Sequence, residues 1–292
     1  MNTLRKATRS KTKMRVALTG VSGSGKTYSS LLLASGMAPW DKIALIDTEN
    51  GSGDLCADLG AYNVITLEAP FTPERYIEAI TQCEDAGMEV IIIDSLSHEW
   101  EGKGGILDVH GNMTGNSYTN WSKVTPRHNA FIQKILQSKC HMVCTIRSKQ
   151  DYVLTEKNGK QVPEKVGLKA ITREGVDYEF TLVFDININH IAIASKDRTS
   201  IFMNPKDETV QSEKITAETG KKILDWTQQG TEKMATPDML AEIEKLCADT
   251  TTDYEKLKTH YKITGDWTDV AAKSAIASLK KKLDTALNAL VA

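Results

Sequence analysis

The chain has 292 residues, of which 40% are hydrophobic and 25% charged, so it is long enough for one large domain and a smaller one. The formal charge of −2 excludes a uniformly basic nucleic-acid-binding protein and restricts any nucleic-acid contact to local basic patches. No apolar run approaches the length of a bilayer span, and the five cysteines lack the spacing of a zinc site. The sequence therefore predicts a soluble protein of the cytoplasm that makes no membrane contact.

The N-terminal tail, residues 1–13, is basic. The first fifteen residues contain six cations and no acid. Such a tail contacts nucleic acid in some proteins, but short basic tails are more often simply solvated, and the second interpretation is favoured here.

From Met14 onward, strand patterns alternate with helical ones. Strands are predicted over 15–18, 42–47, 63–67, 90–93 and 141–146, and helices over 26–36, 72–86 and 127–138. This alternation predicts an α/β fold, with a mainly parallel sheet flanked by helices on both faces.

After residue 150 the pattern changes. Asn158-Gly159 is a strong hairpin signal between two short strand patterns, 152–154 and 160–162. Further strands are predicted over 180–186, 190–194 and 200–203, and a helix over 216–226. Together these segments predict a core domain over residues 14–227.

The remainder predicts a polar linker, 228–235, and a small all-helical C-terminal domain, 236–292. Thr236-Pro237 has the pattern of a capped helix start, and Leu240, Ile243 and Cys247 then mark one face. Thr268 is expected to cap a last helix. Its apolar face would hold Ile276, Leu279, Leu283, Leu287 and Leu290.

One motif decides the class of protein. Residues 20–27 read GVSGSGKT and fit the P-loop pattern G-x-x-x-x-G-K-[ST] in full. Glycines let the backbone wrap a phosphate with its N–H groups pointing inward, and the helix that follows adds its positive end. Lys26 is predicted to pair with the β- and γ-phosphates of ATP, and the Thr27 hydroxyl to ligate Mg²⁺. The predicted nucleotide-binding residues are Gly20, Val21, Ser22, Gly23, Ser24, Gly25, Lys26, Thr27 and Tyr28.

A second motif supports the first. The apolar strand 90–93 ends in Asp94, which predicts a carboxylate at the edge of the sheet, next to the P-loop. With Thr27, Asp94 is the predicted holder of Mg²⁺.

The segments IALIDTENGS, IIIDSLSHEWEG, TIRSK, KVGLK, DYEF and SKDRT resemble RecA-like proteins in order and spacing. Within that family the chain is similar to phage-encoded single-strand annealing proteins of the Sak type, commonly described as phage AAA-type nucleotide-binding proteins. The resemblance covers roughly residues 14–205 and implies a RecA-like P-loop NTPase core. RecA's oligomerisation helix and strand have no counterpart before Met14, so both a ring and a filament stay open.

The resemblance implies catalytic roles. Glu49 would polarise the attacking water, with Glu99 and Glu101 as rivals. Thr145 and Arg147 would sense the γ-phosphate. Lys196 and Arg198 of SKDRT would reach ATP on a neighbouring subunit, which requires a homo-oligomer. Each has a plainer alternative: a solvated acid for Glu49, a surface cation for Arg147, and a salt-bridged strand end around Asp197 for the two cations. His98 is a further phosphate-sensing candidate, or a structural histidine.

DNA contacts are predicted from the hairpin and the loop after it, where backbone phosphates would meet a group of cations. These are Lys157, Lys160, Lys165, Lys169 and Arg173. The segment 116–123, with Tyr118 and Trp121, is expected to form a second loop that stacks bases. A solvated basic hairpin and a packed tryptophan are equally open.

The sequence as a whole predicts an ATP-dependent DNA recombination or single-strand annealing protein that acts on single-stranded DNA as an oligomer and hydrolyses ATP. The alternative is an ATP-gated loader or regulator of a phage replication protein, with slow hydrolysis and no direct stimulation by DNA. A small-molecule kinase fits less well, because no arginine-rich lid is recognisable. The C-terminal helices could bind DNA, a single-strand binding protein or each other.

Overall fold

The computed structural model describes residue 7 and residues 9–157, 160–203, 210–231 and 234–291; the side chains of 150–167, 287 and 289–291 are not described. The chain divides into two compact units. One is Lys13–Thr227, and the other combines the residues before Lys13 with those from Gln228 onward. The predicted Asn158-Gly159 turn lies outside the described residues.

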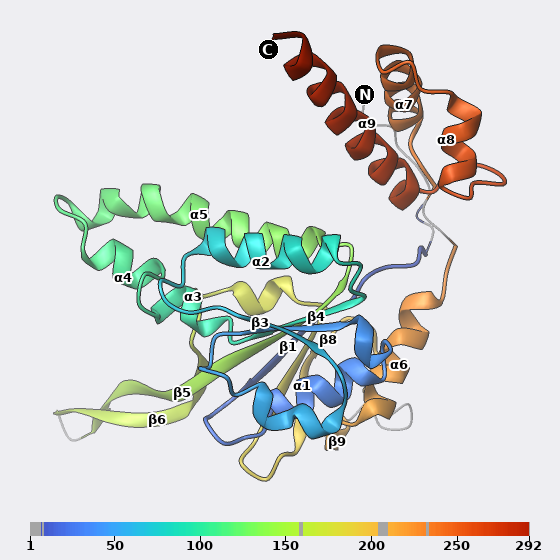
Figure 1. Ribbon diagram of the computed structural model, residues 1–292. Coiled ribbons are helices and arrows are strands. Elements are labelled where there is room, and N and C mark those ends of the chain that lie inside the picture. Colours follow the sequence, from blue (N-terminus) through green and yellow to red (C-terminus); the bar gives the residue numbers. More distant parts are fainter. Residues whose placement is uncertain (1–6, 8, 158–159, 204–209, 232–233, 292) are drawn as a thin grey trace. The chain divides into compact units, whose positions relative to one another are not determined.

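The larger unit is built on one sheet of nine strands in the order β3-β2-β4-β5-β1-β7-β8-β9, with β6 paired to β5 (Figure 1). From β3 to β7 neighbouring strands run parallel, whereas β6, β8 and β9 are antiparallel to their partners. The strands are β1 (Arg15–Gly20), β2 (Ile43–Asp47), β3 (Asn63–Thr66), β4 (Val90–Asp94), β5 (His141–Lys157), β6 (Lys160–Ala170), β7 (Leu182–Ile186), β8 (Ala192–Asp197) and β9 (Ser212–Glu213). The predicted fold class is confirmed.

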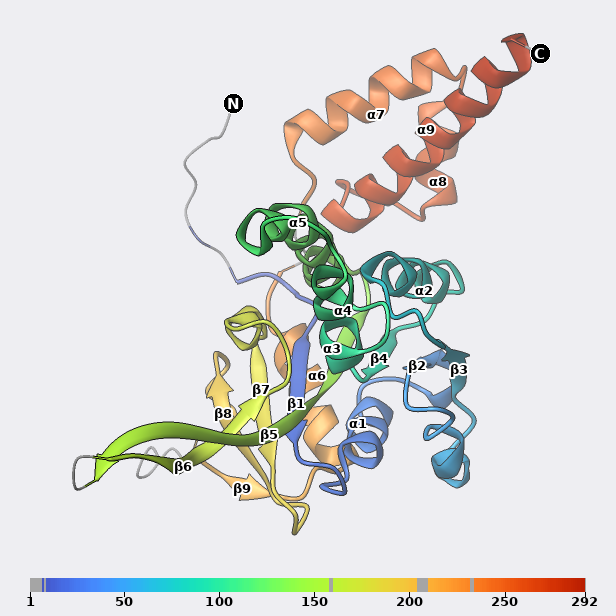
Figure 2. The same cartoon turned by 90° about the vertical axis from the view of Figure 1, so that its left-hand side faces the viewer.

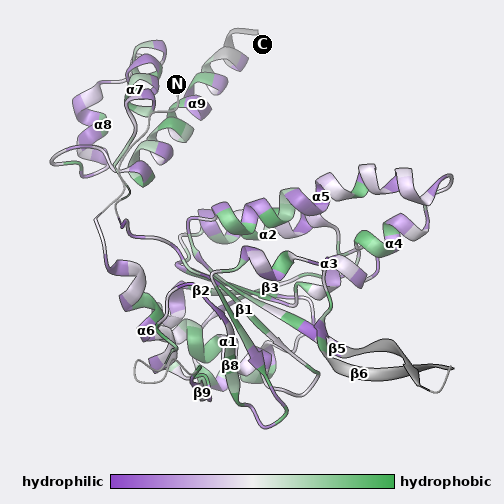
Figure 3. Cartoon of the chain, turned by 180° about the vertical axis from the view of Figure 1, so that it is seen from behind, coloured by the Kyte–Doolittle hydropathy of each residue, from purple (hydrophilic) through white to green (hydrophobic). Residues whose placement is uncertain are grey.

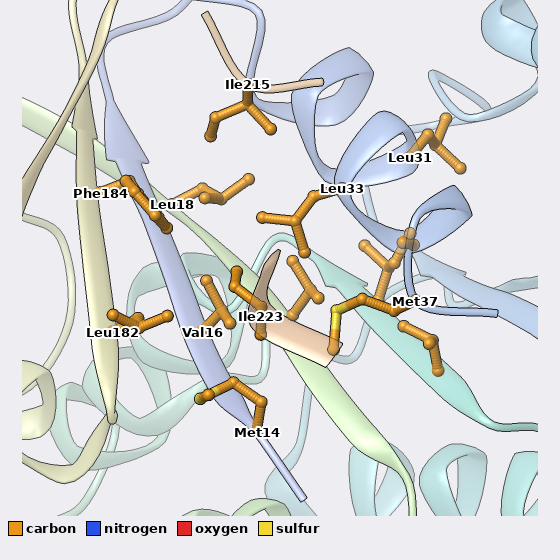
Figure 4. Packing of buried hydrophobic residues seen from close by; sticks show 14 of the residues in the cluster. Met14, Val16, Leu18, Leu31, Leu33, Met37, Leu182, Phe184, Ile215 and Ile223 are labelled. Carbon is orange, nitrogen blue, oxygen red and sulfur yellow. The ribbon is translucent and has the colours of Figure 1, made fainter. Parts of the chain in front are cut away.

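Helices cover both faces of this sheet, because successive side chains of the inner strands point to opposite sides. Val16 and Leu18 of β1 pack with α1 (Lys26–Ser35) and α6 (Ala217–Gln228), as Figure 4 shows for Leu31, Leu33 and Ile223. Ala17 faces the other core, which holds α2 (Pro73–Asp85) and α5 (Ser117–Gln137). Strands buried on both faces explain the unbroken run VIIID of β4.

The segment between β4 and β5 differs from the prediction. Two short helices, α3 (Ser97–Glu101) and α4 (Ile106–Gly111), precede α5, which begins ten residues before the predicted helix start. The side chain of Asn116 caps α5 by accepting from the Tyr118 N–H at 2.8 Å. Pro126 lies inside the helix, where it cannot donate an N–H to the carbonyl of Ser122, an exposed residue. The predicted loop over 116–123 is therefore wrong: Asn116 caps a helix that contains residues 117–123.

Strand β5 runs through the sheet and continues outside it. Its first half, from His141, lies between β1 and β4, and its second half pairs with β6 as an antiparallel arm that extends beyond the sheet (Figure 2). The predicted hairpin is confirmed by this pairing. The predicted strands near 190–194 and 200–203 are displaced: β8 begins at Ala192, and of the second only Met203 pairs, in an isolated bridge with Val210.

The described part of the smaller unit contains three helices: α7 (Pro237–Asp249), α8 (Tyr254–His260) and α9 (Asp269–Val291). Thr236 and Thr268 accept from backbone N–H groups at the starts of α7 and α9, which confirms both predicted caps. Hydrophobic and hydrophilic stretches alternate along α7 and α9 (Figure 3), and Ile243 and Leu279 are buried in their shared core. The backbone of Arg9–Lys11 pairs with Thr231 of the same unit.

Candidate nucleotide-binding site

The phosphate-binding loop joins the end of β1 to the start of α1. Gly23 and Gly25 have φ values of 81° and 85°, a region that side chains with a Cβ rarely adopt. The ammonium of Lys26 donates to the carbonyls of Gly20 and Val21, each at 2.9 Å. Burial lowers the pKa of Lys26, and the nearby Asp94 opposes that effect. Within the described part of the chain, the hydrogen-bond acceptors of this ammonium are carbonyls of its own loop, which a phosphate can replace.

The inside of the loop suits an anion. A Cβ on Gly20 would lie 2.5 Å from Ser24 Oγ and 2.6 Å from the carbonyl of Ile186, so only glycine fits there. Ser24 is fully buried, and within the described part of the chain its hydroxyl has no hydrogen-bond partner. A buried hydroxyl without a partner is costly, and a phosphate oxygen in the loop would satisfy it.

Asp94 lies at the end of β4, where two hydroxyls meet its carboxylate. Thr27 donates to Oδ2 at 2.5 Å, and Thr145, at the corresponding height of β5, donates to Oδ1. The side chain is 2% exposed, and burial raises the pKa of Asp94 despite these hydrogen bonds. Thr27 and Asp94 are therefore in direct contact. Two ligands of one cation must lie close together, so this contact fits a shared cation.

The ends of β2 and β4 are tied together beside Asp94. Thr48 receives the Ser95 N–H at 2.8 Å, and its hydroxyl lies 2.7 Å from Nδ1 of His98. The His98 ring stacks on Phe71, with centroids 4.9 Å apart. Asp47, which is fully buried, accepts from the N–H of Glu49 at 2.6 Å and so fixes the turn that carries Glu49. Asp47 was not among the predicted site residues.

Glu49 and Arg147 form a bidentate ion pair. Arg147 Nε donates to Glu49 Oε1 at 2.8 Å, and the second guanidinium nitrogen donates to Oε2. Partial burial raises the pKa of Glu49, but the hydrogen bonds from Arg147 outweigh it, so the net pKa lies below the ordinary value. The carboxylate is thus ionised at neutral pH and about one-fifth exposed. The structure brings together two residues that were predicted separately.

The rivals of Glu49 are placed differently. Glu99 is fully buried, and its carboxylate oxygens lie 3.0 and 3.1 Å from Nδ1 of His128 on α5. Burial raises the pKa of Glu99, and the His128 hydrogen bond opposes it. The Glu99 carboxylate is therefore buried and in contact with His128 of α5, which does not suit a group that polarises water. Glu101 is exposed at the end of α3.

His190 is a residue that the sequence did not reveal. It sits in the turn between β7 and β8 with φ 64°, and its Nδ1 lies 2.9 Å from the carbonyl of Ser24. A Cβ on Gly25 would approach the same nitrogen at 3.0 Å. The turn thus packs against the phosphate loop. The sequence indicates this turn only through Asn187, a residue type common in turns. The Asn187 side chain accepts from the N–H groups of Asn189 and Ile191.

The two cations of SKDRT contact their own chain. Lys196 Nζ donates to the carbonyls of Asp177 (3.1 Å) and Tyr178 (2.5 Å), and Arg198 donates to the Tyr178 carbonyl at 3.0 Å. Burial lowers the pKa of Lys196, with a contribution from Arg198. Asp197 accepts from backbone N–H groups of the turn that follows, including that of Phe202 at 3.0 Å.

The predicted DNA-contacting residues divide into two groups. Lys157, Lys160 and Lys165 belong to the arm, but their side chains lie outside the described part, whereas Lys169 is exposed at the foot of β6. Arg173 lies beyond β6 and donates to Asn129 of α5 at 3.2 Å, so the structure does not place it on the arm.

The second predicted DNA segment contains a packed tryptophan. Trp121 stacks on His110 at 4.1 Å between centroids and on Trp100 at 6.0 Å. Tyr118, by contrast, is 87% exposed. Trp121 therefore belongs to the packing between α5 and the short helices before it, and it does not serve as a free stacking surface.

Two absences hold for the described residues. None of their His, Cys, Asp and Glu side chains gather in threes as a metal cluster would require. No helix among them combines the length and apolarity needed to cross a bilayer.

The comparisons with known proteins agree with this geometry. A family model described as "AAA domain" matches residues 12–211, more than two-thirds of the chain. No curated protein matches the chain. The matched range contains the phosphate loop, Asp94, Glu49 and Arg147, and a domain of this type binds and hydrolyses nucleotides. The chain belongs to this family of AAA domains.

Proposed function

We propose that the protein is an ATP-dependent DNA recombination or single-strand annealing protein, similar to the phage Sak-type group, and that it works on single-stranded DNA as a homo-oligomer. One observation carries the link between ATP and DNA. The same strand, β5, bears Thr145 and Arg147 at the phosphate site and then continues as one side of the arm. A change at the nucleotide therefore has a direct mechanical route to the arm.

The residues at the sheet edge fit hydrolysis of a nucleoside triphosphate. Thr27 and Asp94 would hold Mg²⁺, which neutralises phosphate charge when it is bound. Lys26 exchanges its loop carbonyls for phosphate oxygens. Glu49 is ionised and can orient and polarise water once Arg147 turns toward the γ-phosphate. Arg147 thereby passes from holding the carboxylate to stabilising the charge on the transferred group.

The arm suits a polyanion by its register. Lys157 lies directly opposite Lys160, and Lys149 lies directly opposite Lys169. Lys149 and Lys169 are exposed, and like charges placed opposite each other across two strands are destabilising. A phosphodiester backbone along the arm would offset this repulsion, and binding would then depend strongly on salt.

Oligomer formation follows from the resemblance of SKDRT to cations that act across subunits. In the free chain Lys196 and Arg198 are held by neutral carbonyls of Asp177 and Tyr178, with no carboxylate partner among the described residues. The positive charges of Lys196 and Arg198 are thus not neutralised by a direct ion pair. Such cations remain able to stabilise the charge on a neighbouring subunit's phosphate.

The test is steady-state ATP hydrolysis with and without single-stranded DNA at low and moderate salt. We expect DNA to raise the rate, higher salt to weaken that effect, and Lys26→Ala to abolish hydrolysis. The double variant Lys157→Ala, Lys160→Ala should keep the DNA-free rate and lose most of the stimulation. Exchange of the exposed Lys256 and Lys262 of the C-terminal unit is the matched control.

A different outcome would select the alternative. Hydrolysis that depends on Lys26 but is indifferent to DNA would refute the DNA role. The ATP-gated loader or regulator, acting on a replication protein, would then be the better account.

A further inference from the structure

Ser95 directly follows Asp94 and carries a hydroxyl to which the hydrolysis proposed above gives no role. The residue is fully buried, and within the described part of the chain its Oγ has no hydrogen-bond partner. The hydroxyls of Thr27 and Thr145, by contrast, both donate to Asp94. A buried hydroxyl without a partner costs free energy, so we expect the Ser95 hydroxyl to gain a partner in another arrangement of the site.

The backbone of Ser95 is fixed on both sides. Its N–H donates to Thr48 Oγ1 at 2.8 Å, and its carbonyl accepts from the hydroxyl of the fully buried Tyr76 at 3.3 Å. The side chain of Arg147, by contrast, is 38% exposed. Of these two neighbours of Glu49, the guanidinium therefore has room to turn, whereas Ser95 keeps its position.

The Glu49 carboxylate is close to both groups. Burial raises the pKa of Glu49, Arg147 lowers it, and the nearby Ser95 hydroxyl adds a smaller lowering, although no hydrogen bond joins Ser95 to Glu49 in the described structure. Arg147 donates to both carboxylate oxygens. When the guanidinium turns toward a phosphate, Glu49 loses both hydrogen bonds at the moment when its orientation matters for attack.

Other polar groups near Glu49 are already engaged. The His98 ring lies 2.7 Å from the Thr48 hydroxyl, and Lys26 donates to carbonyls of its own loop. Among the described neighbours of Glu49, the Ser95 hydroxyl is thus a donor that can be used without breaking an existing hydrogen bond.

We infer that Ser95 is a positioning residue: when Arg147 turns toward the γ-phosphate, the Ser95 hydroxyl donates to Glu49 in its place and keeps the carboxylate directed at the attacking water. This inference rests on the proposed hydrolysis. It gives the unpaired hydroxyl its partner and leaves Arg147 available to the phosphate, so that both residues serve the same carboxylate in turn.

The first experiment is a double-mutant cycle of urea unfolding without nucleotide, with Ser95→Ala, Arg147→Met and the two combined. With Arg147 present, Ser95→Ala should change the unfolding equilibrium constant by less than about twofold, because the hydroxyl removed has no partner. In the Arg147→Met background the hydroxyl can pair with Glu49, and Ser95→Ala should then reduce stability about tenfold, equivalent to about 1.4 kcal/mol.

Thr227→Ala is the matched control, since Thr227 is 1% exposed and donates to the Leu224 carbonyl of α6. Its cost should be the same with and without Arg147. Equal costs of Ser95→Ala in both backgrounds would mean a purely structural serine and would overturn the inference.

The second experiment measures single-turnover hydrolysis and ATP affinity. Ser95→Ala should slow hydrolysis about tenfold while the dissociation constant of ATP changes by less than about twofold, because the hydroxyl acts on Glu49 and not on the nucleotide. An unaltered rate in the folded variant would contradict the positioning role. If the unaltered protein did not hydrolyse ATP at all, the proposed function would fail, which is a distinct result; the unfolding cycle would still decide whether Ser95 can replace Arg147 at Glu49.

Discussion

The two ends of the central sheet carry buried charges that are satisfied in different ways. At the carboxyl end, Lys26 donates hydrogen bonds to carbonyls of its own loop, and Glu49 accepts hydrogen bonds from Arg147. At the amino end, the guanidinium of Arg15 donates to the carbonyls of Met14, Leu136, Ser138 and Cys140. There also, the Met14 N–H donates to Nδ1 of His141 at 3.1 Å.

The difference separates structural charges from functional ones. Arg15 is 6% exposed, and its guanidinium donates to four carbonyls of its own chain, so it cannot leave without cost. The partners of Lys26 and Glu49 are groups that a ligand can replace, and both side chains keep partial contact with solvent. Burial alone does not identify a functional site; the replaceability of the partners does.

The largest expected effect lies at the carboxyl end. Glu49→Gln should reduce the ATP hydrolysis rate by about 10²- to 10⁴-fold, because the amide cannot polarise water. Nucleotide affinity and unfolding free energy should change little. Single-turnover hydrolysis, chemical denaturation and nucleotide titration measure the three quantities.

Glu101→Gln is the control for this experiment, since Glu101 is exposed near the same site. A loss of hydrolysis in Glu101→Gln that matches the loss in Glu49→Gln would show that the wrong carboxylate had been chosen.

Arg15→Met tests the amino end. We expect the unfolding free energy to fall by about 3 kcal/mol, because several buried carbonyls lose a charged donor. Hydrolysis per folded molecule should stay unchanged. Arg75→Met removes a guanidinium that also donates to two carbonyls, those of Glu68 and Pro70, but at the surface, and it should cost less than about 1 kcal/mol. Similar losses of unfolding free energy in Arg15→Met and Arg75→Met would contradict the structural role of Arg15.

The stabilisation of the fold by bound Mg–ATP should depend only on residues at the carboxyl end of the sheet. At a concentration 100 times the dissociation constant, Mg–ATP should raise the unfolding free energy by about 2.7 kcal/mol. Lys26→Ala should abolish this increment, and Arg15→Met should retain it in full. Denaturation curves with and without nucleotide give both values; an increment that shrank in Arg15→Met would mean that the two ends are coupled.

The smallest effect concerns pH. Burial, helped by Lys13 and Arg15, lowers the pKa of His141 from 6.5 to about 3. Between these values the unfolded state binds the proton and the folded state does not, so stability falls as the pH drops below 6.5. The loss should be about 1.4 kcal/mol per pH unit. Urea denaturation at pH 6.5 and pH 5 should show a shallower decrease for His141→Gln; parallel curves would argue against this role.

The sequence was sufficient for most of the sheet and for the phosphate loop. The strand 90–94 and the loop 20–27 follow local rules: a β-branched run for a strand buried on both faces, and glycines where φ is positive. Helix caps at Thr236 and Thr268 are local as well. Such features need only neighbouring residues, and the structure agrees with each of them.

What sequence reasoning missed depends on distant contacts. Glu49 and Arg147 are 98 positions apart, and their pairing follows only from the order β2-β4-β5 in the sheet. Glu99 was a rival candidate because nothing nearby reveals that His128 takes up its carboxylate. Pro126 gave a local reason to start α5 too late, while packing of Trp121 on His110 supports the earlier turns.

The chain passes between its two units twice, once between Thr12 and Lys13 and once between Thr227 and Gln228. Since Arg9–Lys11 pairs with Thr231, a truncation after Thr227 also removes the pairing partner of the N-terminal segment. An expression design for the isolated ATPase unit should therefore cut both ends together, keeping residues 13–227. The same double passage makes the larger unit an insertion within the smaller one, so that a linker joining residues 12 and 228 would give the small unit as a single continuous polypeptide.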